Sequence, residues 1–285
     1  MITPSTSITA AGRVAIVTGS NKGIGFYIAL QLASSGLFQN LILACRDPVR
    51  GQTAAQKIVQ EMPSTVNTSV SYEPLTLGDA ASHASFCQKM DETFGGKVDV
   101  LVNNAGFAFK GADPTPFKDQ CKPTLDINFR GTAEFTESML PLLRKGTDAR
   151  IVNVASKSGH LSQLQTKELR DKFTSSSLTM PKLQELVDEF ESDVNNGIHQ
   201  QRGWGNSNYG LSKLAVIAAT KVWAREEEQN GIKVNCCCPG YCKTDMTSQR
   251  GLRAPSDGAK NAVLPAIMEN CPQGEFFSNY AVSQW

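Results

Sequence analysis

The stretch TGSNKGIG, residues 18–25, decides how this 285-residue chain is organised. It follows an apolar run, RVAIVTG (13–19), that is typical of a buried strand, and it opens a segment of helical length at 24–35. Its three glycines let the backbone turn tightly and come close to a pyrophosphate, which the N-terminus of a helix binds well. A glycine triplet alone is a weak signal. Because strand, loop and helix follow one another here, the stretch predicts a nucleotide-binding site.

Outward from this loop, short apolar runs alternate with longer amphipathic segments. The strand-like runs cover 13–19, 40–46, 68–75, 98–106, 149–156 and 232–240, and the segments of helical length cover 24–35, 50–61, 82–94, 119–144 and 209–229. Runs rich in Val, Ile and Leu indicate strands that are buried on both faces, as in a parallel sheet covered by helices. The pattern predicts an α/β fold, a Rossmann-type doubly wound parallel sheet of about seven strands with helices on both faces.

The segment 157–208 interrupts this alternation. Apolar residues recur there at helical spacing, between a proline and a glycine: Leu183, Leu186, Val187, Phe190 and Val194. A core of this size is too small to fold alone. We therefore expect a single domain over 13–285 with a helical insertion at about 160–205, preceded by a disordered N-terminal tail over 1–12.

The composition excludes several classes of function. The net charge of +1 provides no broad field that would attract nucleic acid or an anionic membrane. No apolar run approaches the roughly 18 residues of a membrane span, and the N-terminus lacks the apolar core of a secretory signal. Eight cysteines, three of them consecutive and none paired with histidines, favour a reducing, cytoplasmic location over disulfides or a metal site.

The residue that follows the second strand indicates which dinucleotide is bound. An acidic residue there would hold the ribose 2′-hydroxyl and select NAD. This chain instead has Cys45 followed by Arg46, and Lys22 lies within the glycine loop. Because arginine binds phosphate through two hydrogen bonds, we predict NADPH or NADP+ as the cofactor. The alternative is that both cations are solvated, with Asp47 paired to Arg46.

Four motifs that occur in order connect the chain to a known family. They are TGSNKGIG, NNAG (103–106), NVAS ending at Ser156, and Tyr209-x-x-x-Lys213. With the segment CCCPGYCKTDM (236–246), they make the sequence resemble the short-chain dehydrogenase/reductase family from about residue 13 to the C-terminus. The motifs are specific as a set, and the resemblance covers nearly the whole chain.

The resemblance extends to one subgroup of that family. The long segment before Tyr209, the stretch FAFKGADPTPF (107–117) and the C-terminal QW are similar to the monomeric carbonyl reductases. This likeness implies NADPH-dependent reduction of aldehydes, ketones and quinones. It also implies that the insertion covers the helices through which other family members form oligomers, so that the chain is a monomer.

Reduction of a carbonyl needs a hydride at carbon and a proton at oxygen, and the protein supplies the proton. Tyr209 and Lys213 share one helical face, and an ammonium one turn away favours the phenolate and lowers the pKa of the phenol. We predict that Tyr209 is the general acid and that Lys213 tunes it. Ser156 ends a strand, where its hydroxyl can hydrogen-bond the substrate oxygen. By resemblance, Asn128 orders a water that relays protons to the lysine.

The resemblance also implies which residues contact the cofactor and the substrate. The cofactor-binding set comes from the glycine loop, the strand ends, the tyrosine helix and the Pro-Gly segment: Gly19, Asn21, Lys22, Gly23, Ile24, Gly25, Arg46, Leu75, Thr76, Asn104, Ala105, Gly106, Tyr209, Lys213, Pro239, Gly240 and Thr244. The substrate set is Ser156, Ala108, Phe109 and Tyr241. Thr76 stands where the family usually has an acid that binds adenine, and Asp79 follows one turn later. Trp204 either lines the substrate pocket or anchors the insertion.

Two other functions remain open at this point. A catalytically silent NADPH-binding sensor or scaffold would keep the glycine loop, but such proteins often lose the tyrosine or the lysine, and both are present here. A dedicated ketone reductase or alcohol dehydrogenase of specialised metabolism would use the same scaffold, because pocket shape depends on the insertion and the loops. The cysteine run also suggests a redox sensor. Strand alternation separates Cys237 from its neighbours, which leaves Cys238 and Cys242 as the candidate thiols.

Overall fold

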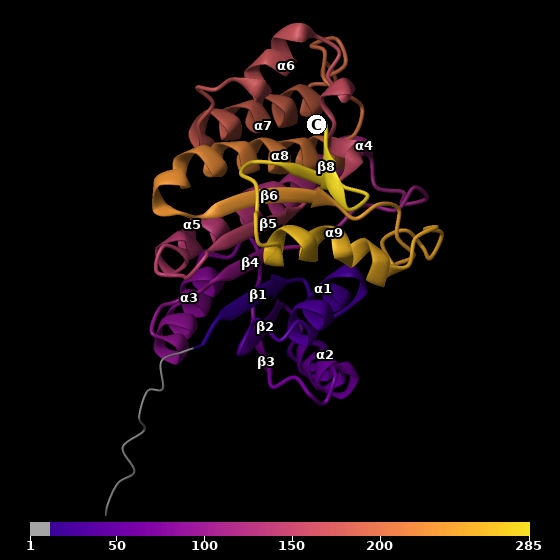
Figure 1. The fold of residues 1–285 in the computed structure, drawn as a ribbon. Helices are drawn as coiled ribbons and strands as arrows, with labels where there is room; N and C mark the ends of the chain where they lie inside the picture. The colour runs from indigo at the N-terminus through magenta and orange to yellow at the C-terminus, as the bar shows by residue number, and fades with distance from the viewer. Residues whose placement is uncertain (1–11) are drawn as a thin grey trace, which may run out of the picture.

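The computed structural model describes residues 12–285, which are organised around one eight-stranded sheet (Figure 1). The strand order is β3-β2-β1-β4-β5-β6-β7-β8. The strands are β1 (Val14–Thr18), β2 (Asn40–Cys45), β3 (Ser69–Pro74), β4 (Val100–Asn103), β5 (Arg150–Val154), β6 (Lys233–Cys238), β7 (Phe276–Ser278) and β8 (Ala281–Ser283). All neighbours are parallel except β7 and β8. The predicted doubly wound sheet is confirmed, whereas β7 and β8 are too short for their pattern to be recognised.

Helices cover both faces of the sheet (Figure 1). On one face lie α1 (Gly23–Ser34), α2 (Pro48–Glu61) and α9 (Pro255–Ile267). On the other lie α3 (Ala80–Phe94), α4 (Phe117–Leu125), α5 (Gly131–Leu143) and α8 (Asn208–Glu226). The single helix predicted at 119–144 is divided by a π-helical turn, η1 (Asp126–Arg130), and α9 escaped sequence analysis.

Alternate strand residues enter separate cores, as expected for strands buried on both faces. In β1, Val14 and Ile16 pack on the α3 and α5 side, whereas the two residues that alternate with them pack on the α1 and α2 side. In β6, Cys237 joins the second core, while Cys236 and Cys238 belong to a smaller cluster on the opposite face. The alternation expected for the cysteine run is confirmed.

The segment between β5 and α8 contains two helices and two short 3₁₀ turns: α6 (Lys167–Thr174), α7 (Met180–Asn195), η2 (Lys157–Gly159) and η3 (Leu161–Gln163). Helix α7 has the helical spacing that the sequence predicts. Trp204 is fully buried between Phe173 and Phe190, and its indole Nε1 donates to Asp193 at 2.8 Å. Trp204 therefore anchors this segment. A further turn, η4 (Glu228–Asn230), follows α8.

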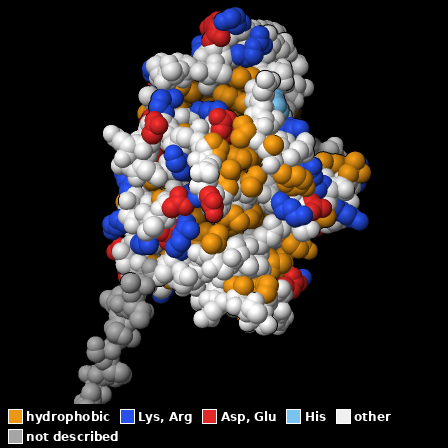
Figure 2. All heavy atoms as spheres, in the orientation of Figure 1, with side chains coloured by type: hydrophobic (Ala, Val, Ile, Leu, Met, Phe, Trp, Pro, Cys, Tyr) orange, Lys and Arg blue, Asp and Glu red, His pale blue; other side chains and the backbone are white. Residues whose placement is uncertain are grey.

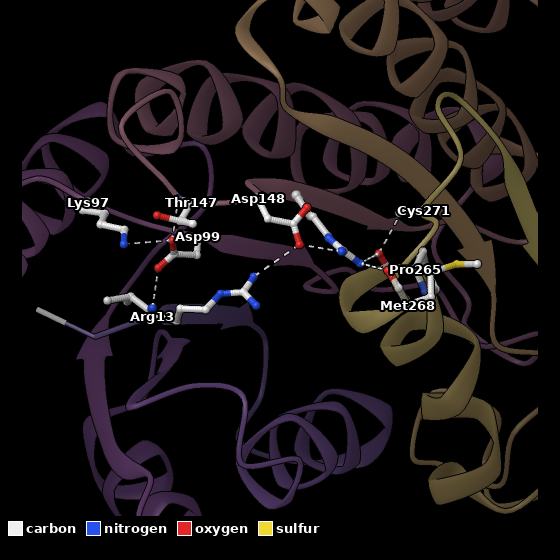
Figure 3. Close-up of polar contacts among 10 residues, drawn as sticks. Arg13, Lys97, Asp99, Thr147, Asp148, Pro265, Met268 and Cys271 are labelled. Atoms are coloured by element: carbon white, nitrogen blue, oxygen red, sulfur yellow. Dashed lines mark hydrogen bonds and ion pairs between the residues drawn. The ribbon is translucent and has the colours of Figure 1, made fainter.

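Buried polar groups fix the amino ends of the parallel strands, at the edge opposite the loops discussed below (Figure 3). The Asp99 carboxylate accepts from the backbone N–H of Val14 and of Thr147, each at 2.7 Å, and lies 3.4 Å from the ammonium of Lys97. It is fully buried. One side chain thus connects the start of β1 to the turn that precedes β5.

A second group of polar contacts joins β5 to α9 (Figure 3). Arg150 donates to the carboxylate of Asp148 at 2.6 Å and to the carbonyl oxygen of Met268 at 2.7 Å. Arg13 lies 3.8 Å from the same carboxylate. These contacts order the strand starts, because each buried charge is hydrogen-bonded or paired.

The outer surface shown in Figure 2 carries basic and acidic side chains interspersed, in keeping with the net charge of +1. No helix within residues 12–285 is long and apolar enough to cross a membrane. Most of the predicted N-terminal tail lies outside the described residues.

Candidate active site

The glycine loop between β1 and α1 needs glycine for two physical reasons. Gly19 and Gly23 have φ values of +63° and +59°, in the left-handed region that side chains disfavour. A Cβ at Gly19 would lie 2.8 Å from the Cα of Ala105, and a Cβ at Gly25 would lie 2.5 Å from the carbonyl oxygen of Gly19. The loop is therefore packed too tightly for larger residues, as expected of a phosphate-binding turn.

Two polar side chains hold this loop against the end of β4. Asn104 Nδ2 donates to the carbonyl oxygens of Thr18 at 2.9 Å and Gly19 at 3.2 Å. The Thr18 hydroxyl accepts from the backbone N–H of Asn104 at 3.0 Å and of Ala105 at 2.9 Å. Asn104 thus shapes the loop through its own hydrogen bonds. Sequence analysis missed Thr18, whose only signal is its place before the first glycine.

The N-terminus of α1 is open to an anion. Its N-cap residue, Lys22, makes no side-chain capping bond, and the first turn carries no acidic residue. The helix dipole and the unpaired N–H groups therefore favour a phosphate there. In this structure Lys22 Nζ lies 2.7 Å from a carboxylate oxygen of Asp245, with both side chains more than half exposed. Sequence analysis did not predict this ion pair.

The predicted 2′-phosphate residue, Arg46, follows β2 and is exposed. It forms no ion pair within residues 12–285. The alternative pairing with Asp47 is not the one observed, because Asp47 lies 3.3 Å from Arg50 and caps α2 by accepting from the backbone N–H of that residue. The Arg46 guanidinium is therefore available to a phosphate.

The turn after β3 holds the residues assigned to adenine. Leu75 is buried, and the backbone N–H of Thr76 donates to Ser82 Oγ at 2.9 Å. The carboxylate of Asp79 caps α3 by accepting from the N–H groups of Ala81 and Ser82. Asp79 is thus already engaged by its own helix through one carboxylate oxygen.

The segment after β6 closes over the glycine loop from the other side. Gly240 has a φ of +83°, which turns the chain directly after Pro239. A Cβ at Gly23 would lie 3.7 Å from the Cγ2 of Thr244. Together with the ion pair of Lys22, this contact brings the loops after β1, β4 and β6 to the same edge of the sheet. Ligands of open α/β sheets bind at this carboxyl edge.

Helix α8 carries the tyrosine and the lysine to the same edge. Ser207 caps the helix by accepting from the backbone N–H of Gly210 at 2.9 Å. Lys213 Nζ donates to the carbonyl oxygen of Val154, the last residue of β5, at 2.8 Å and lies 5.8 Å from the centroid of the Tyr209 ring. The Ser156 hydroxyl lies close enough to the Tyr209 phenol to affect its pKa. The structure thus brings Ser156, Tyr209 and Lys213 together.

Asn128 lies in the π-helical turn η1 and reaches the same group. Its Nδ2 donates to the carbonyl oxygen of Phe107 at 2.9 Å and to Ser212 Oγ at 3.1 Å, and its Oδ1 accepts from the N–H of Phe107 at 2.9 Å. Ser212 in turn donates to the carbonyl oxygen of Tyr209 at 2.8 Å. A Cβ at Gly106 would lie 2.9 Å from Asn128 Oδ1 and 3.6 Å from Lys213 Nζ. Sequence analysis missed Ser212.

Burial dominates the acid-base properties of this group. It raises the pKa of Tyr209 to about 12, and the nearby Ser156 hydroxyl opposes that rise. Burial also lowers the pKa of Lys213 to about 8. The sequence predicts that Lys213 lowers the pKa of Tyr209, but in the chain without cofactor desolvation outweighs any such attraction. The phenol therefore keeps its proton at neutral pH.

Three further residues assigned to substrate lie in the segments that follow β4 and β6. Ala108 and Phe109 follow the end of β4, and the Phe109 ring packs on that of Phe107 with centroids 5.3 Å apart. Tyr241 is 56% exposed. Beside it lies a hollow of about 550 Å³ that extends to Lys157, the residue after Ser156.

The cysteines near the site are buried rather than reactive. Burial raises the pKa of Cys242 to about 11. Cys242 Sγ donates to the carbonyl oxygen of Pro239, and Cys238 Sγ accepts from the N–H of Gly240, each at 3.4 Å. These two backbone groups belong to one trans peptide and point in opposite directions, so the sulfurs lie on opposite sides of it. This geometry argues against a disulfide between them.

Comparisons with known proteins agree with this site. The chain matches the model of the short chain dehydrogenase family over residues 13–167 and 194–254. It is 38% identical over 282 residues to human carbonyl reductase (NADPH) 1, covering 95% of this chain and 98% of that protein. It is 35% identical to mouse carbonyl reductase (NADPH) 3, covering 98% of this chain and 100% of that protein.

Two solved plant enzymes are similar in fold. Salutaridine reductase from Papaver somniferum has a TM-score of 0.83 and 29% identity, covering 93% of this chain and 99% of that one. Menthone neomenthol reductase from Mentha piperita has a TM-score of 0.77 and 29% identity, covering 94% and 98%. The family match includes the glycine loop, Asn128, Ser156, Tyr209 and Lys213. With the sheet order and the shared loop edge, it shows that the chain belongs to the short chain dehydrogenase family.

Proposed function

We propose that this protein uses NADPH to reduce carbonyl compounds, that is aldehydes, ketones and quinones, to alcohols. The observation that carries the proposal is the convergence of Ser156, Tyr209 and Lys213 beside the glycine loop. The names of the curated relatives, carbonyl reductases (NADPH), support both the reaction and the cofactor.

The residues of this chain fit the proposed cofactor. The pyrophosphate would lie on the uncapped N-terminus of α1, where the tight glycine turn leaves room for it. Arg46 and Lys22 would bind the 2′-phosphate, and Lys22 would exchange the carboxylate of Asp245 for it. Carboxylate and phosphate are both anions, so the ion pair with Asp245 supports the proposal that the Lys22 ammonium can bind an anion at this position.

The proton would come from Tyr209. NADPH supplies the hydride when bound. Tyr209 holds its proton at neutral pH and would donate it to the carbonyl oxygen, while the Ser156 hydroxyl hydrogen-bonds the same oxygen as charge develops. The Lys213 ammonium, 5.8 Å from the ring, would favour the phenolate once the proton has left. Asn128 and Ser212 would hold the backbone of Phe107 and Tyr209 in place for this transfer.

Replacing the phenol tests the proposal. We expect Tyr209→Phe to lower kcat for NADPH oxidation by roughly 10²- to 10⁴-fold with quinones and aromatic aldehydes, the contribution typical of a general acid. Fluorescence titration should show that NADPH still binds, because the ring remains. Turnover close to that of the wild type would refute the role of Tyr209. Absence of turnover in the wild type with every compound would favour the sensor function instead.

A second candidate, a dedicated ketone reductase of specialised metabolism, is supported by the likeness to salutaridine reductase and menthone neomenthol reductase. Comparison of kcat/KM across a set of quinones, aldehydes and ketones separates the two functions. One ketone that exceeds the others by several orders of magnitude would favour the dedicated enzyme, and similar values would favour a broad reductase.

We further propose that the chain is a single domain and a monomer. Helix α7 packs against α4 and α8, and so covers the helices through which oligomers of the family would associate. Residues 168–193, which fall between the two matched ranges, contain most of α7, which supports an insertion there. All eight cysteines are free, which is typical of a reducing compartment and supports a cytoplasmic location.

A further inference from the structure

A hollow beside the proposed catalytic group has a charge that the reaction itself does not require. Its volume is about 550 Å³, and it lies between Lys157, at the start of η2, and Arg253, in the segment that leads to α9. Lys157 directly follows Ser156 in the chain. The hollow is therefore lined by the residue next to the serine that would hold the carbonyl oxygen.

Arg253 is fixed in place by neutral partners only. Its guanidinium donates to the carbonyl oxygen of Pro239 at 3.0 Å and to Asn279 Oδ1 at 2.7 Å, and its Cζ lies 5.5 Å from the centroid of the Tyr280 ring. No carboxylate within residues 12–285 lies within ion-pair distance of it. The charge of Arg253 is thus oriented without an ion pair, although Asp257 lies near enough for the two charges to interact.

The other charged groups at the hollow leave it net positive. Lys157 is exposed and forms no ion pair in the described part of the chain. The one carboxylate that lines the hollow, Asp257, lies 2.8 Å from the ammonium of Lys260, which compensates its charge. The wall also carries two exposed, largely apolar side chains: Tyr241 is 56% exposed and Leu252 is 96% exposed.

We infer that Lys157 and Arg253 select carbonyl substrates that also carry a carboxylate. The carbonyl group lies at Ser156, the carboxylate lies between the two cations, and the apolar body of the substrate covers Tyr241 and Leu252. The guanidinium offers a preoriented donor pair and the ammonium a mobile one, a combination that suits a carboxylate. The inference rests on the proposed function, because it names the substrate class of that same site.

A matched pair of aldehydes tests this selection. 4-Carboxybenzaldehyde and methyl 4-formylbenzoate share the ring and the reacting group and differ in charge. In the wild type at low salt we expect the acid to have the higher kcat/KM. Lys157→Met should lower the acid-to-ester ratio of kcat/KM about fivefold, mainly through the KM of the acid, since one partly exposed charge contact is lost. Added salt should lower the same ratio in the wild type.

A control and a binding measurement keep the outcomes separate. Lys89→Met removes the same charge from the exposed side of α3 and should leave the ratio unchanged. A ratio that is the same in wild type and Lys157→Met, or that is insensitive to salt, overturns the inference. If the wild type reduces neither aldehyde, the ratio has no value, and the proposed function fails only when quinones and ketones are not reduced either. Calorimetric titration with terephthalate then decides the inference alone: weaker binding to Lys157→Met supports it, and equal binding overturns it.

Discussion

Lys213 is the residue at which the proposed chemistry and the stability of the fold conflict most clearly, because the reaction uses an ammonium and burial penalises that charge. The folded chain without cofactor lowers its pKa to about 8 by burial, whereas an unfolded chain keeps a lysine protonated to about pH 10.4. Between these values the unfolded state binds more protons, so the stability contributed by this residue rises with pH. Below pH 8 the lysine is protonated in both states, so the free-energy cost of burying its charge does not change with pH.

This difference predicts the pH dependence of one variant. Relative to Lys213→Met, the wild type should gain about 2–3 kcal/mol in the free energy of unfolding between pH 8 and pH 10.4. Urea unfolding of both proteins without cofactor, at several pH values, measures this difference and cancels the groups they share. A constant difference over that range would show that Lys213 titrates normally in the folded chain.

At the residue scale, the candidate site residues were easier to predict than the contacts that they make. Sequence motifs identified Asn128, Ser156, Tyr209 and Lys213, and the structure brings all four together. They gave no sign that Lys22 pairs with Asp245, because those residues come from loops far apart in the chain. The direction of the pKa shift at Tyr209 also escaped sequence analysis, since desolvation depends on everything packed around the ring.

At the scale of elements, the start of α1 and the end of β4 form one packed unit. A Cβ at Gly25 would lie 2.4 Å from Asn104 Nδ2 and 2.5 Å from the carbonyl oxygen of Gly19, the two groups whose hydrogen bond shapes the loop. Any side chain there has to move the helix away from the strand end. The phosphate-binding turn would then open.

Gly25→Ala should therefore lose cofactor affinity. We expect the Kd for NADPH to rise at least tenfold, or about 1.4 kcal/mol, because the N-terminus of α1 no longer lies where the pyrophosphate binds. Fluorescence titration measures the Kd. Gly111→Ala is the matched control, since a Cβ at Gly111 would meet no atom within 4 Å. Unchanged affinity in Gly25→Ala would mean that the helix accommodates the methyl group without opening the turn.

The sequence located most elements but not every boundary. One helix was predicted at 119–144, but a π-helical turn that contains Asn128 divides it. The Asn128 side chain hydrogen-bonds the backbone of Phe107, and the apolar spacing of the sequence reveals neither the turn nor this contact. Helix α9 escaped because Gly258 and Pro265 weaken its pattern. The glycine is required there, since a Cβ at Gly258 would lie 2.3 Å from Cys242 Sγ. In each case a tertiary contact decides the local structure.

At the scale of the whole molecule, the two edges of the sheet have separate roles. The loops of the proposed active site meet at the carboxyl edge, whereas Asp99 and Arg150 join strands and helices at the amino edge (Figure 3). The Asp99 and Arg150 side chains at the amino edge are buried, and their hydrogen bonds favour a fixed arrangement there. Stability and catalysis should therefore respond to different substitutions.

Asp99→Ala tests this separation. The variant leaves the backbone N–H groups of Val14 and Thr147 without their acceptor, so we expect it to lower the free energy of unfolding by about 2–4 kcal/mol. Its kcat/KM at a temperature where the protein stays folded should remain within about twofold of the wild type, since no group at the carboxyl edge changes.

Asp91→Ala is the control: this exposed carboxylate lies 3.9 Å from Lys145, and its loss should cost less than about 1 kcal/mol. Denaturant unfolding and steady-state kinetics on the three proteins provide both readouts. A large fall in kcat/KM for folded Asp99→Ala would show that the two edges are coupled, because a brace at the amino ends of the strands would then control the loops at their carboxyl ends.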